Sequence, residues 1–303
     1  MSYNIPILFL VFNRPETTAK VFNKIRSIKP KKLYVVADGP RKNNNNDIVN
    51  SNKVKDIIKQ VDWPCKVKKL YRKENSGCRV SVSNGITWFF KHEKMGVILE
   101  DDCLPNNSFF NFCEKLLLKY EFDNRVMHIS GNTFISDKIR SKYITGDYFF
   151  SKYPHISGWA TWRRAWNLYN HNMSNYNNNL KKIIDNNNSL LEKLYWSKIF
   201  KLVYNNKINS WGYVWLYSIW ENKGLSIQPK YNLVKNIGFG IDATHTNKII
   251  SGFSNYHYLK LKKHPLIVDS NKFVDSYISK YHYNISFLGL FLKLYNHFKL
   301  FLK

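Results

Sequence analysis

Strand-like and helix-like segments alternate through the first hundred residues, and this alternation restricts the fold more than any other feature. Strand patterns occupy residues 5–12, 33–37, 66–71 and 96–99. Helix patterns lie between them, at residues 15–28, 52–60 and 78–92. Strands separated by helices at this rhythm form right-handed βαβ units and a mostly parallel sheet. The sequence therefore predicts an α/β fold with a Rossmann-like central sheet flanked by helices.

The pattern changes after a further helix at 107–120 and a strand at 125–129. Residues 148–166 are rich in aromatic side chains, and helices are expected at 190–204 and 211–222, followed by a strand at 226–229. The asparagine runs Asn43–Asn46 and Asn186–Asn188 are predicted to be polar loops. None of the apolar runs reaches the roughly 20 residues of a membrane-spanning helix, and no signal peptide is expected at the start.

The chain carries a large excess of positive charge, +26 over 303 residues, which calls for an anionic partner. Nucleic acid, an anionic membrane surface and a phosphorylated substrate are the candidates. The basic residues are spread over the whole chain, whereas a nucleic-acid binder concentrates them in a stripe or a recognisable module. A binder of nucleic acid is therefore not expected, and the 44% apolar composition excludes global disorder.

Three consecutive carboxylates follow the fourth predicted strand, in the sequence Val97-Ile98-Leu99-Glu100-Asp101-Asp102. Such neighbours repel one another, and burying them is costly unless a cation neutralises them. In open α/β sheets, ligands bind at the carboxyl ends of the strands. Oxygen ligands suit Mg²⁺ or Mn²⁺, which often complete their coordination with substrate phosphates. A metal site is favoured here over a solvated acidic turn.

Polar residues also follow the first two strands. Asp38 is either a turn-forming residue before Gly39-Pro40 or a carboxylate that binds a ribose or base at the same sheet edge. Asn13 and Arg14 occupy the corresponding place after the first strand. Arg14 could hold a phosphate, stack on a base, or form a surface ion pair.

With these residues in view, the chain resembles nucleotide-sugar-dependent glycosyltransferases of the GT-A fold. It is similar more narrowly to bacterial sugar transferases of surface-polysaccharide clusters, relatives of the family 2 and N-acetylglucosaminyltransferase I-type enzymes. The resemblance rests on six segments: Phe12-Asn13-Arg14-Pro15, Ala37-Asp38-Gly39-Pro40, Asn75-Ser76-Gly77-Cys78-Arg79, Leu99–Asp102, Gly158-Trp159-Ala160-Thr161-Trp162-Arg163, and Asn236-Ile237-Gly238-Phe239-Gly240 through Ala243-Thr244-His245-Thr246.

The resemblance implies a role for most of these residues. Glu100-Asp101-Asp102 would be the DxD-type motif, in which Asp102 binds Mn²⁺ or Mg²⁺ and the other two acids belong to the nucleotide-sugar site. Asn13, Arg14 and Asp38 would contact the nucleoside, and Arg79 would lie near the donor. His245 would be a second candidate for the metal or the diphosphate. Residues 1–250 would form the transferase domain, with a donor half to about 135, an acceptor half from about 136, and a basic tail at 251–303.

The catalytic base is where the sequence departs from the family. An inverting transferase needs a carboxylate to deprotonate the acceptor hydroxyl. The resemblance places an aspartate just after Trp211, where this chain has Gly212. The carboxylates that remain as candidates for the base are Glu221, Asp147 and Asp242, of which Glu221 is preferred. Asp101 is also expected to take part directly in catalysis.

Two other features concern partners. Trp159 and Trp211 are expected to contact the acceptor, because aromatic faces stack on sugars, although core packing also explains tryptophans. Residues 286–303 place apolar side chains at helical spacing with lysines between them, as in a helix that lies on anionic lipid or packs on the domain.

The resemblance and the acidic motif together predict a metal-dependent glycosyltransferase. A UDP-hexose or UDP-N-acetylhexosamine is the expected donor, a glycan or lipid-linked molecule the acceptor, and inversion the expected outcome. The protein would be cytoplasmic and peripheral on the inner face of the cell membrane. The alternative is a catalytically impaired, membrane-associated protein of the same fold that binds nucleotide sugars or glycans; a nucleotidyltransferase is weaker, because a lysine at a phosphate-binding glycine loop is missing.

Overall fold

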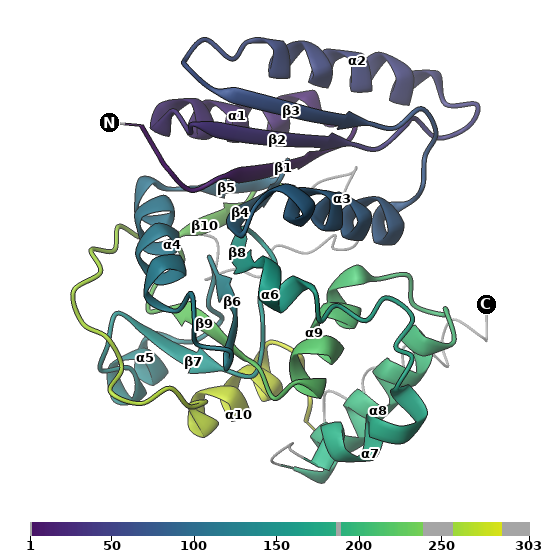
Figure 1. Cartoon of the computed structure of the whole chain (residues 1–303). Coiled ribbons are helices and arrows are strands. Elements are labelled where there is room, and N and C mark those ends of the chain that lie inside the picture. The colour runs from purple at the N-terminus through teal and green to yellow at the C-terminus, as the bar shows by residue number, and fades with distance from the viewer. Residues whose placement is uncertain (1, 186–188, 239–256, 287–303) are drawn as a thin grey trace.

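The computed structural model describes residues 2–185, 189–238 and 257–286 (Figure 1). Its strands are β1 Ile7–Val11, β2 Lys32–Ala37, β3 Lys66–Tyr71, β4 Met95–Glu100, β5 Cys103–Pro105, β6 Val126–Ser130, β7 Tyr148–Ser151, β8 Trp159–Trp162, β9 Leu225–Pro229 and β10 Val234–Asn236. Its helices are α1 Pro15–Ile28, α2 Asn45–Lys59, α3 Cys78–His92, α4 Asn107–Lys119, α5 Asp137–Tyr143, α6 Arg163–Trp166, α7 Tyr176–Asp185, α8 Leu190–Tyr204, α9 Trp211–Glu221 and α10 Lys272–Tyr281.

Eight strands form one sheet in the order β3-β2-β1-β4-β8-β6-β9-β7, and β10 pairs with β5 in a small second sheet. β3, β2, β1 and β4 are parallel neighbours, and β8 runs antiparallel between β4 and β6. β9 is parallel to β6, and β7 is antiparallel to β9. Six of the eight strands therefore point the same way. This mostly parallel sheet with flanking helices confirms the predicted Rossmann-like α/β class.

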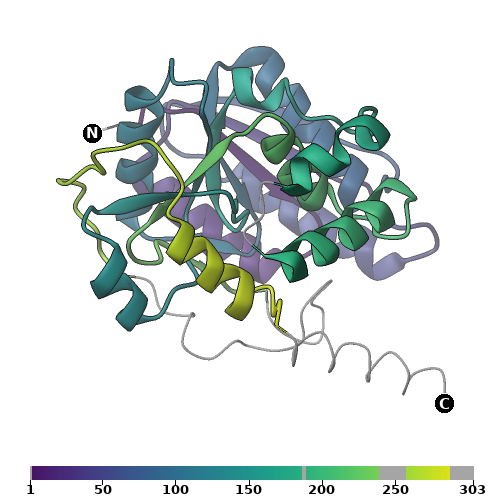
Figure 2. The ribbon, with the colours of Figure 1, turned by 90° about the horizontal axis from the view of Figure 1, so that it is seen from below.

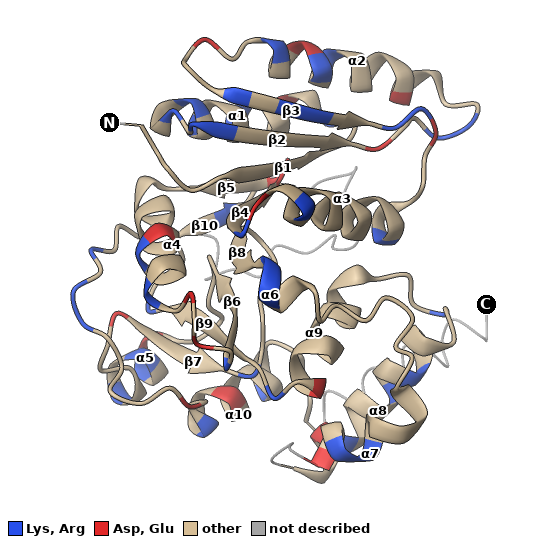
Figure 3. Cartoon of the chain, in the orientation of Figure 1, with Lys and Arg blue, Asp and Glu red and all other residues tan. Residues whose placement is uncertain are grey.

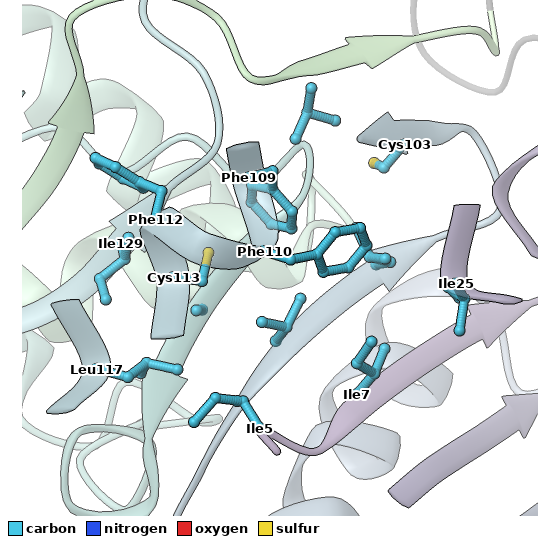
Figure 4. Packing of buried hydrophobic residues seen from close by; sticks show 14 of the residues in the cluster. Ile5, Ile7, Ile25, Cys103, Phe109, Phe110, Phe112, Cys113, Leu117 and Ile129 are labelled. Atoms are coloured by element: carbon cyan, nitrogen blue, oxygen red, sulfur yellow. The ribbon is translucent and has the colours of Figure 1, made fainter. Parts of the chain in front are cut away.

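Both faces of the central strands are covered, which explains why their sequences are apolar without interruption. Successive side chains of a strand point to opposite faces. Ile7 and Phe9 pack with α1, α2 and α4 on one face, while Leu8 and Leu10 pack with α3, α8 and α9 on the other. Figure 4 shows the first of these layers, where phenylalanines of α4 meet Ile7 of β1 and Ile25 of α1.

The asparagine run at Asn43–Asn46 was predicted as a loop, and this prediction is wrong for its second half. α2 begins at Asn45, because the Asn44 side chain accepts a hydrogen bond from the Asp47 backbone N–H at 3.1 Å and caps the helix. Asn186–Asn188 lies outside the described residues. The helices α7 and α10 were not predicted.

The described part of the basic tail, residues 257–286, packs on the same domain. Leu259 and Leu261 belong to the core beside α4, and α10 buries Val274 and Ile278 in the opposite layer. Figure 2 shows α10 lying close to α5 and β7. The helix expected at the C-terminus falls outside the described residues apart from its first residue, Ser286.

Lysine and arginine are distributed over most of the described elements rather than on one of them (Figure 3). They occur on β2 and β3 at one end of the molecule and on α7, α8 and α10 at the other. No helix in the described ranges has the length and apolar character needed to cross a membrane.

Candidate functional site

The acidic turn lies at the carboxyl edge of the sheet, beside the end of β1. β4 ends at Glu100, which pairs with Leu10 of the adjacent strand β1. The chain after β1 brings Arg14 over the turn, where its guanidinium donates to Asp102 Oδ2 at 3.1 Å and to Asp101 Oδ1. The Phe12 backbone N–H donates to the other oxygen of Asp101, at 3.4 Å. The adjacency of β1 and β4 thus joins two motifs 88 residues apart.

The turn holds more negative charge than Arg14 can neutralise. Burial, the charge of Asp102 and then that of Asp101 together raise the pKa of Glu100 to about 8, against the opposing charge of Arg14. Burial also raises the pKa of Asp101 to about 6, although the neighbouring Arg14 opposes this increase. Burial alone would lower the pKa of Arg14, but the two aspartates raise it above its ordinary value. The turn is therefore an electrostatic site for additional positive charge.

Gly238 lies directly on the ion pair. β10 pairs with β5 immediately after the turn, and the Ile237 N–H donates to the backbone oxygen of Asp102 at 2.8 Å. A Cβ atom on Gly238 would lie 2.4 Å from Asp102 Oδ2 and 2.8 Å from Arg14 Nη1. Only glycine permits this approach. The sequence motif contained Gly238, but its spacing did not indicate the contact.

Asp38 lies at the end of β2 and fastens the loop that precedes α3. Its carboxylate accepts hydrogen bonds from the Gly39 and Ser76 backbone N–H groups, both at 3.0 Å. Gly39 sits against the Glu74 backbone, so closely that a Cβ would lie 2.3 Å from it. The structure therefore gives Asp38 a role in shaping the site, which does not test its predicted contact with a nucleoside.

Cys78, the first residue of α3, shows that these groups converge. Desolvation of the thiol, the charge of Glu100 and then that of Asp38 together raise the pKa of this thiol to about 11, although the residue as a whole is exposed. The start of α3 therefore lies within electrostatic range of both acidic strand ends. Sequence reasoning did not identify Cys78, although it lies in a motif that carried the resemblance.

Asn13 is turned toward α2 rather than toward the acidic turn. Its amide donates to Asp47 Oδ1 at 2.7 Å, and Arg41 pairs with the same carboxylate. The Arg41 hydrogen bond lowers the pKa of Asp47 to about 2. In this conformation, Asn13 positions the β1 loop against α2.

Arg79 also points away from the acidic turn. Its guanidinium donates to the Asn206 side-chain oxygen and to the His171 backbone oxygen, both at 3.0 Å. Its side chain thus faces the segment after α8 and the loop before α7. The structure brings together Arg14, Asp38, Asp101 and Asp102, with Glu100, whereas the side chains of Asn13 and Arg79 point elsewhere.

No candidate base in the described residues meets the acidic turn. Glu221 ends α9 and precedes β9, whose first residue pairs with the first residue of β6. It therefore lies at the amino edge of the sheet, opposite Asp102, and accepts from the Asn179 amide at 3.0 Å. A base must lie within hydrogen-bond reach of the reacting hydroxyl, and this position of Glu221 does not bring it to the acidic turn, so its role as the base stays a prediction. Asp147 accepts backbone N–H groups of Lys262 and Lys263, and Asp242 and His245 lie outside the described residues.

The two tryptophans predicted to contact an acceptor are core residues. Trp159 is 0% exposed and Trp211 is 3% exposed. Their rings stack on each other with centroids 5.8 Å apart, and Trp159 also stacks on His128. Neither indole presents a face to solvent, so the structure shows both side chains packed in the core, and their contact with an acceptor stays a prediction.

The donor set of the turn fits Mg²⁺ or Mn²⁺ in part. Mg²⁺ in proteins takes one or two carboxylates, substrate phosphates and several waters. Asp102, with a side chain 17% exposed, and Asp101 offer carboxylate oxygens at a turn that has surplus negative charge. Within the described ranges, no three His, Cys, Asp or Glu side chains are grouped to hold a metal. The remaining ligands would therefore have to come from phosphate, from water or from other residues.

Comparisons with known proteins do not extend this assignment. No family model matches the sequence, and no curated protein matches it. Among solved structures, UDP-glucose pyrophosphorylase complexed with UDP-glucose aligns with a TM-score of 0.32 and 10% identity, over 54% of this chain and 78% of that chain. The 4-diphosphocytidyl-2C-methyl-D-erythritol synthase from Anaerococcus prevotii DSM 20548 aligns with a TM-score of 0.33 and 10% identity, over 66% of this chain and 84% of that chain. At these TM-scores the likeness carries no functional argument.

Proposed function

We propose that the protein is a metal-dependent glycosyltransferase that uses a nucleotide-diphosphate sugar. A UDP-hexose or UDP-N-acetylhexosamine would be the donor, and a glycan or lipid-linked molecule of surface-polysaccharide synthesis would be the acceptor. The configuration at the anomeric carbon of the transferred sugar would be inverted. The observation that carries the proposal is the acidic turn at the carboxyl edge of the sheet, where Asp101 and Asp102 face Arg14. Ligands of open α/β folds bind at this edge.

Different residues of the site would have different roles in binding the diphosphate of the donor. Asp102 and Asp101 would hold Mn²⁺ or Mg²⁺, which as a Lewis acid stabilises the negative charge that develops on the departing diphosphate. Arg14, whose side chain is 26% exposed, keeps a permanent positive charge beside the same place. Asp38 holds the loop before α3 through the Ser76 N–H, which fixes the wall of the site next to the nucleoside position.

The second candidate is an impaired nucleotide-sugar or glycan-binding protein of the same fold. It is favoured by Gly212, which carries no carboxylate at the expected position of the base, and by the location of Glu221 at the opposite sheet edge. The two candidates differ in turnover, because only the enzyme consumes its donor.

Introducing an aspartate at position 212 separates these candidates. A Cβ on Gly212 would contact the terminal carbon of Ile156 at 2.8 Å, and this flexible side chain can move aside. We expect Gly212→Asp to change the rate of sugar transfer by less than about tenfold, since the native chain already has a base in this proposal. A well-placed general base contributes about 10²–10⁴-fold. A gain of that size, measured as UDP release with acceptor present, would instead indicate that the native protein lacks its base.

We further propose that the protein is cytoplasmic and binds the inner face of the cell membrane, with anionic lipid as its partner. Leu266 and Ile267 are 103% and 74% exposed and follow Lys262 and Lys263 closely. Exposed apolar side chains that follow lysines closely favour an anionic lipid interface. The wild type should sediment with vesicles that contain phosphatidylserine and much less with pure phosphatidylcholine, and the double variant Leu266→Asp/Ile267→Asp should lose at least about half of this binding. Equal sedimentation of wild type and variant would exclude this segment as the contact.

A further inference from the structure

A cavity of about 480 Å³ opens beside the start of α3 and is separate from the acidic turn. Its lining comes from α3, the loop before α7 and the end of α8: Arg79, Asn172, Met173, Tyr204, Asn205 and Asn206. Consecutive residues of a helix point about 100° apart. Cys78 lies within electrostatic range of the acidic strand ends, while the next residue, Arg79, lines the cavity. The two sites therefore flank the same helix start.

Arg79 is a buried cation that is bonded only to neutral groups. Its exposure is 8%, and its guanidinium donates to the side-chain amide oxygen of Asn206 and to the backbone oxygen of His171. Within the described ranges it forms no ion pair, and its buried Nε has no hydrogen-bond partner. Burying a charge without an opposite charge is costly. A cavity lined by such a side chain is therefore suited to an anion.

The other lining groups indicate what kind of molecule carries the anion. Asn172, Asn205 and Asn206 supply amide donors and acceptors, which match the hydroxyl groups of a sugar. The Tyr204 ring is 38% exposed and is stacked on Tyr176 with centroids 4.4 Å apart, so that it is held in place. The volume is within the range of about 300–1,000 Å³ typical of small-molecule sites.

We propose that this cavity binds an acceptor sugar through an anionic substituent, either a uronate carboxylate or a phosphate ester. The hydrogen bonds to Asn206 and His171 use two of the five N–H donors of the Arg79 guanidinium, and the remaining donors can hold an oxyanion. The inference rests on the proposed transferase function, because the cavity lies beside the site assigned to the donor. It also replaces the donor contact predicted for Arg79 from the sequence.

The probes are D-glucuronic acid, D-glucose 6-phosphate and D-glucose, titrated into the full chain and followed by protein NMR. We expect at least one anionic sugar to bind tenfold or more tightly than glucose. Comparing the affinities of glucuronic acid and glucose 6-phosphate then shows whether the cavity prefers a carboxylate or a phosphate. Arg79→Gln should remove this preference. Arg163→Gln is the matched control, because Arg163 also donates to a backbone oxygen, that of Glu93, but does not line the cavity.

Asn205→Asp tests the charge argument without removing the buried arginine. The substitution is almost isosteric, and the exposed side chain at this position tolerates it. A carboxylate in the lining should pair with Arg79 and weaken binding of the anionic sugar by at least tenfold. Unchanged binding in this variant, or equal binding of glucose and the anionic sugars by the wild type, would overturn the inference.

The same variants separate this inference from the proposed function. If Arg79→Gln abolishes Mn²⁺-dependent binding of UDP-N-acetylglucosamine, then Arg79 serves the donor, and the cavity assignment falls while the transferase proposal stands. If the wild type binds an anionic sugar through Arg79 but binds no nucleotide sugar, the transferase proposal falls and the anion site stands.

Discussion

Asp102→Asn is expected to abolish the Mn²⁺-dependent binding of UDP-sugars and to lower turnover by about 100-fold or more. A bound metal contributes several kcal/mol to charge stabilisation in such reactions, and each 1.36 kcal/mol corresponds to a factor of ten in rate. The substitution removes the charge but keeps an oxygen that can accept from Arg14, now 3.1 Å away. The fold should therefore survive. Thermal unfolding with UDP-glucose or UDP-N-acetylglucosamine, with and without Mn²⁺, measures the first effect, and UDP release measures the second.

Asp62→Asn is the matched control for charge. Asp62 pairs with Arg26 on the surface, and its side chain is 64% exposed. Such exposed ion pairs contribute little to stability, so this variant should behave like the wild type in both assays. A metal-dependent shift that persists in Asp102→Asn would show that the metal assignment to Asp102 is wrong.

Gly238→Ala is expected to reduce metal-dependent donor binding by at least about tenfold. The added methyl group would lie 2.4 Å from Asp102 Oδ2, a distance that real Cβ atoms do not tolerate, so the carboxylate or the β10 segment has to move. Overpacking of this kind costs about 1–3 kcal/mol. Titration of Mn²⁺ in the presence of UDP, followed by calorimetry, measures the loss.

Gly85→Ala is the control for adding a methyl group. The three atoms nearest to its Cβ would be side-chain methyl groups of Val36 and Leu10, at 3.0–3.4 Å. Alanine also favours the interior of a helix more than glycine does, which offsets the closer contact. If Gly238→Ala binds Mn²⁺ and UDP as well as Gly85→Ala does, the close approach of Gly238 has no part in holding Asp102.

The first half of the sheet could be predicted from sequence because its signals are local. Parallel strands that are buried on both faces are apolar throughout, and helices separate them, of which α1 begins with Pro15 and an acid, Glu16, in its first turn. β3 was predicted at its observed bounds, 66–71, although it carries three lysines. The insertion of β8 between β4 and β6 could not be predicted, since pairing between distant segments leaves no period in the sequence.

The acidic residues of the candidate site could be predicted from the sequence, but the contacts of its other side chains could not. Glu100, Asp101 and Asp102 stand out because three carboxylates follow a buried strand. The direction of Arg79 depends on the phase of α3, and the location of Glu221 depends on the length of α9. That helix has 11 residues, or about 16 Å, which is enough to carry Glu221 from one sheet edge to the other.

The burial of Trp159 and Trp211 could not be predicted from the sequence for a related reason. An aromatic residue in a sequence motif is equally compatible with a sugar platform and with the core, and only burial separates the two roles. Trp159 and Trp211 are buried against each other, whereas the exposed ring at the candidate acceptor cavity is Tyr204. No periodic signal marked Tyr204.

Metal-dependent consumption of a nucleotide sugar tests the central claim most directly. The full chain would be incubated with UDP-glucose and with UDP-N-acetylglucosamine in Mn²⁺ and, separately, in EDTA, while UDP release and the thermal unfolding midpoint are measured. A ligand that binds the native state raises this midpoint. The proposal predicts that at least one donor raises the midpoint and releases UDP only when the metal is present. If no nucleotide sugar raises the unfolding midpoint or releases UDP, with or without Mn²⁺, the result would contradict the proposal.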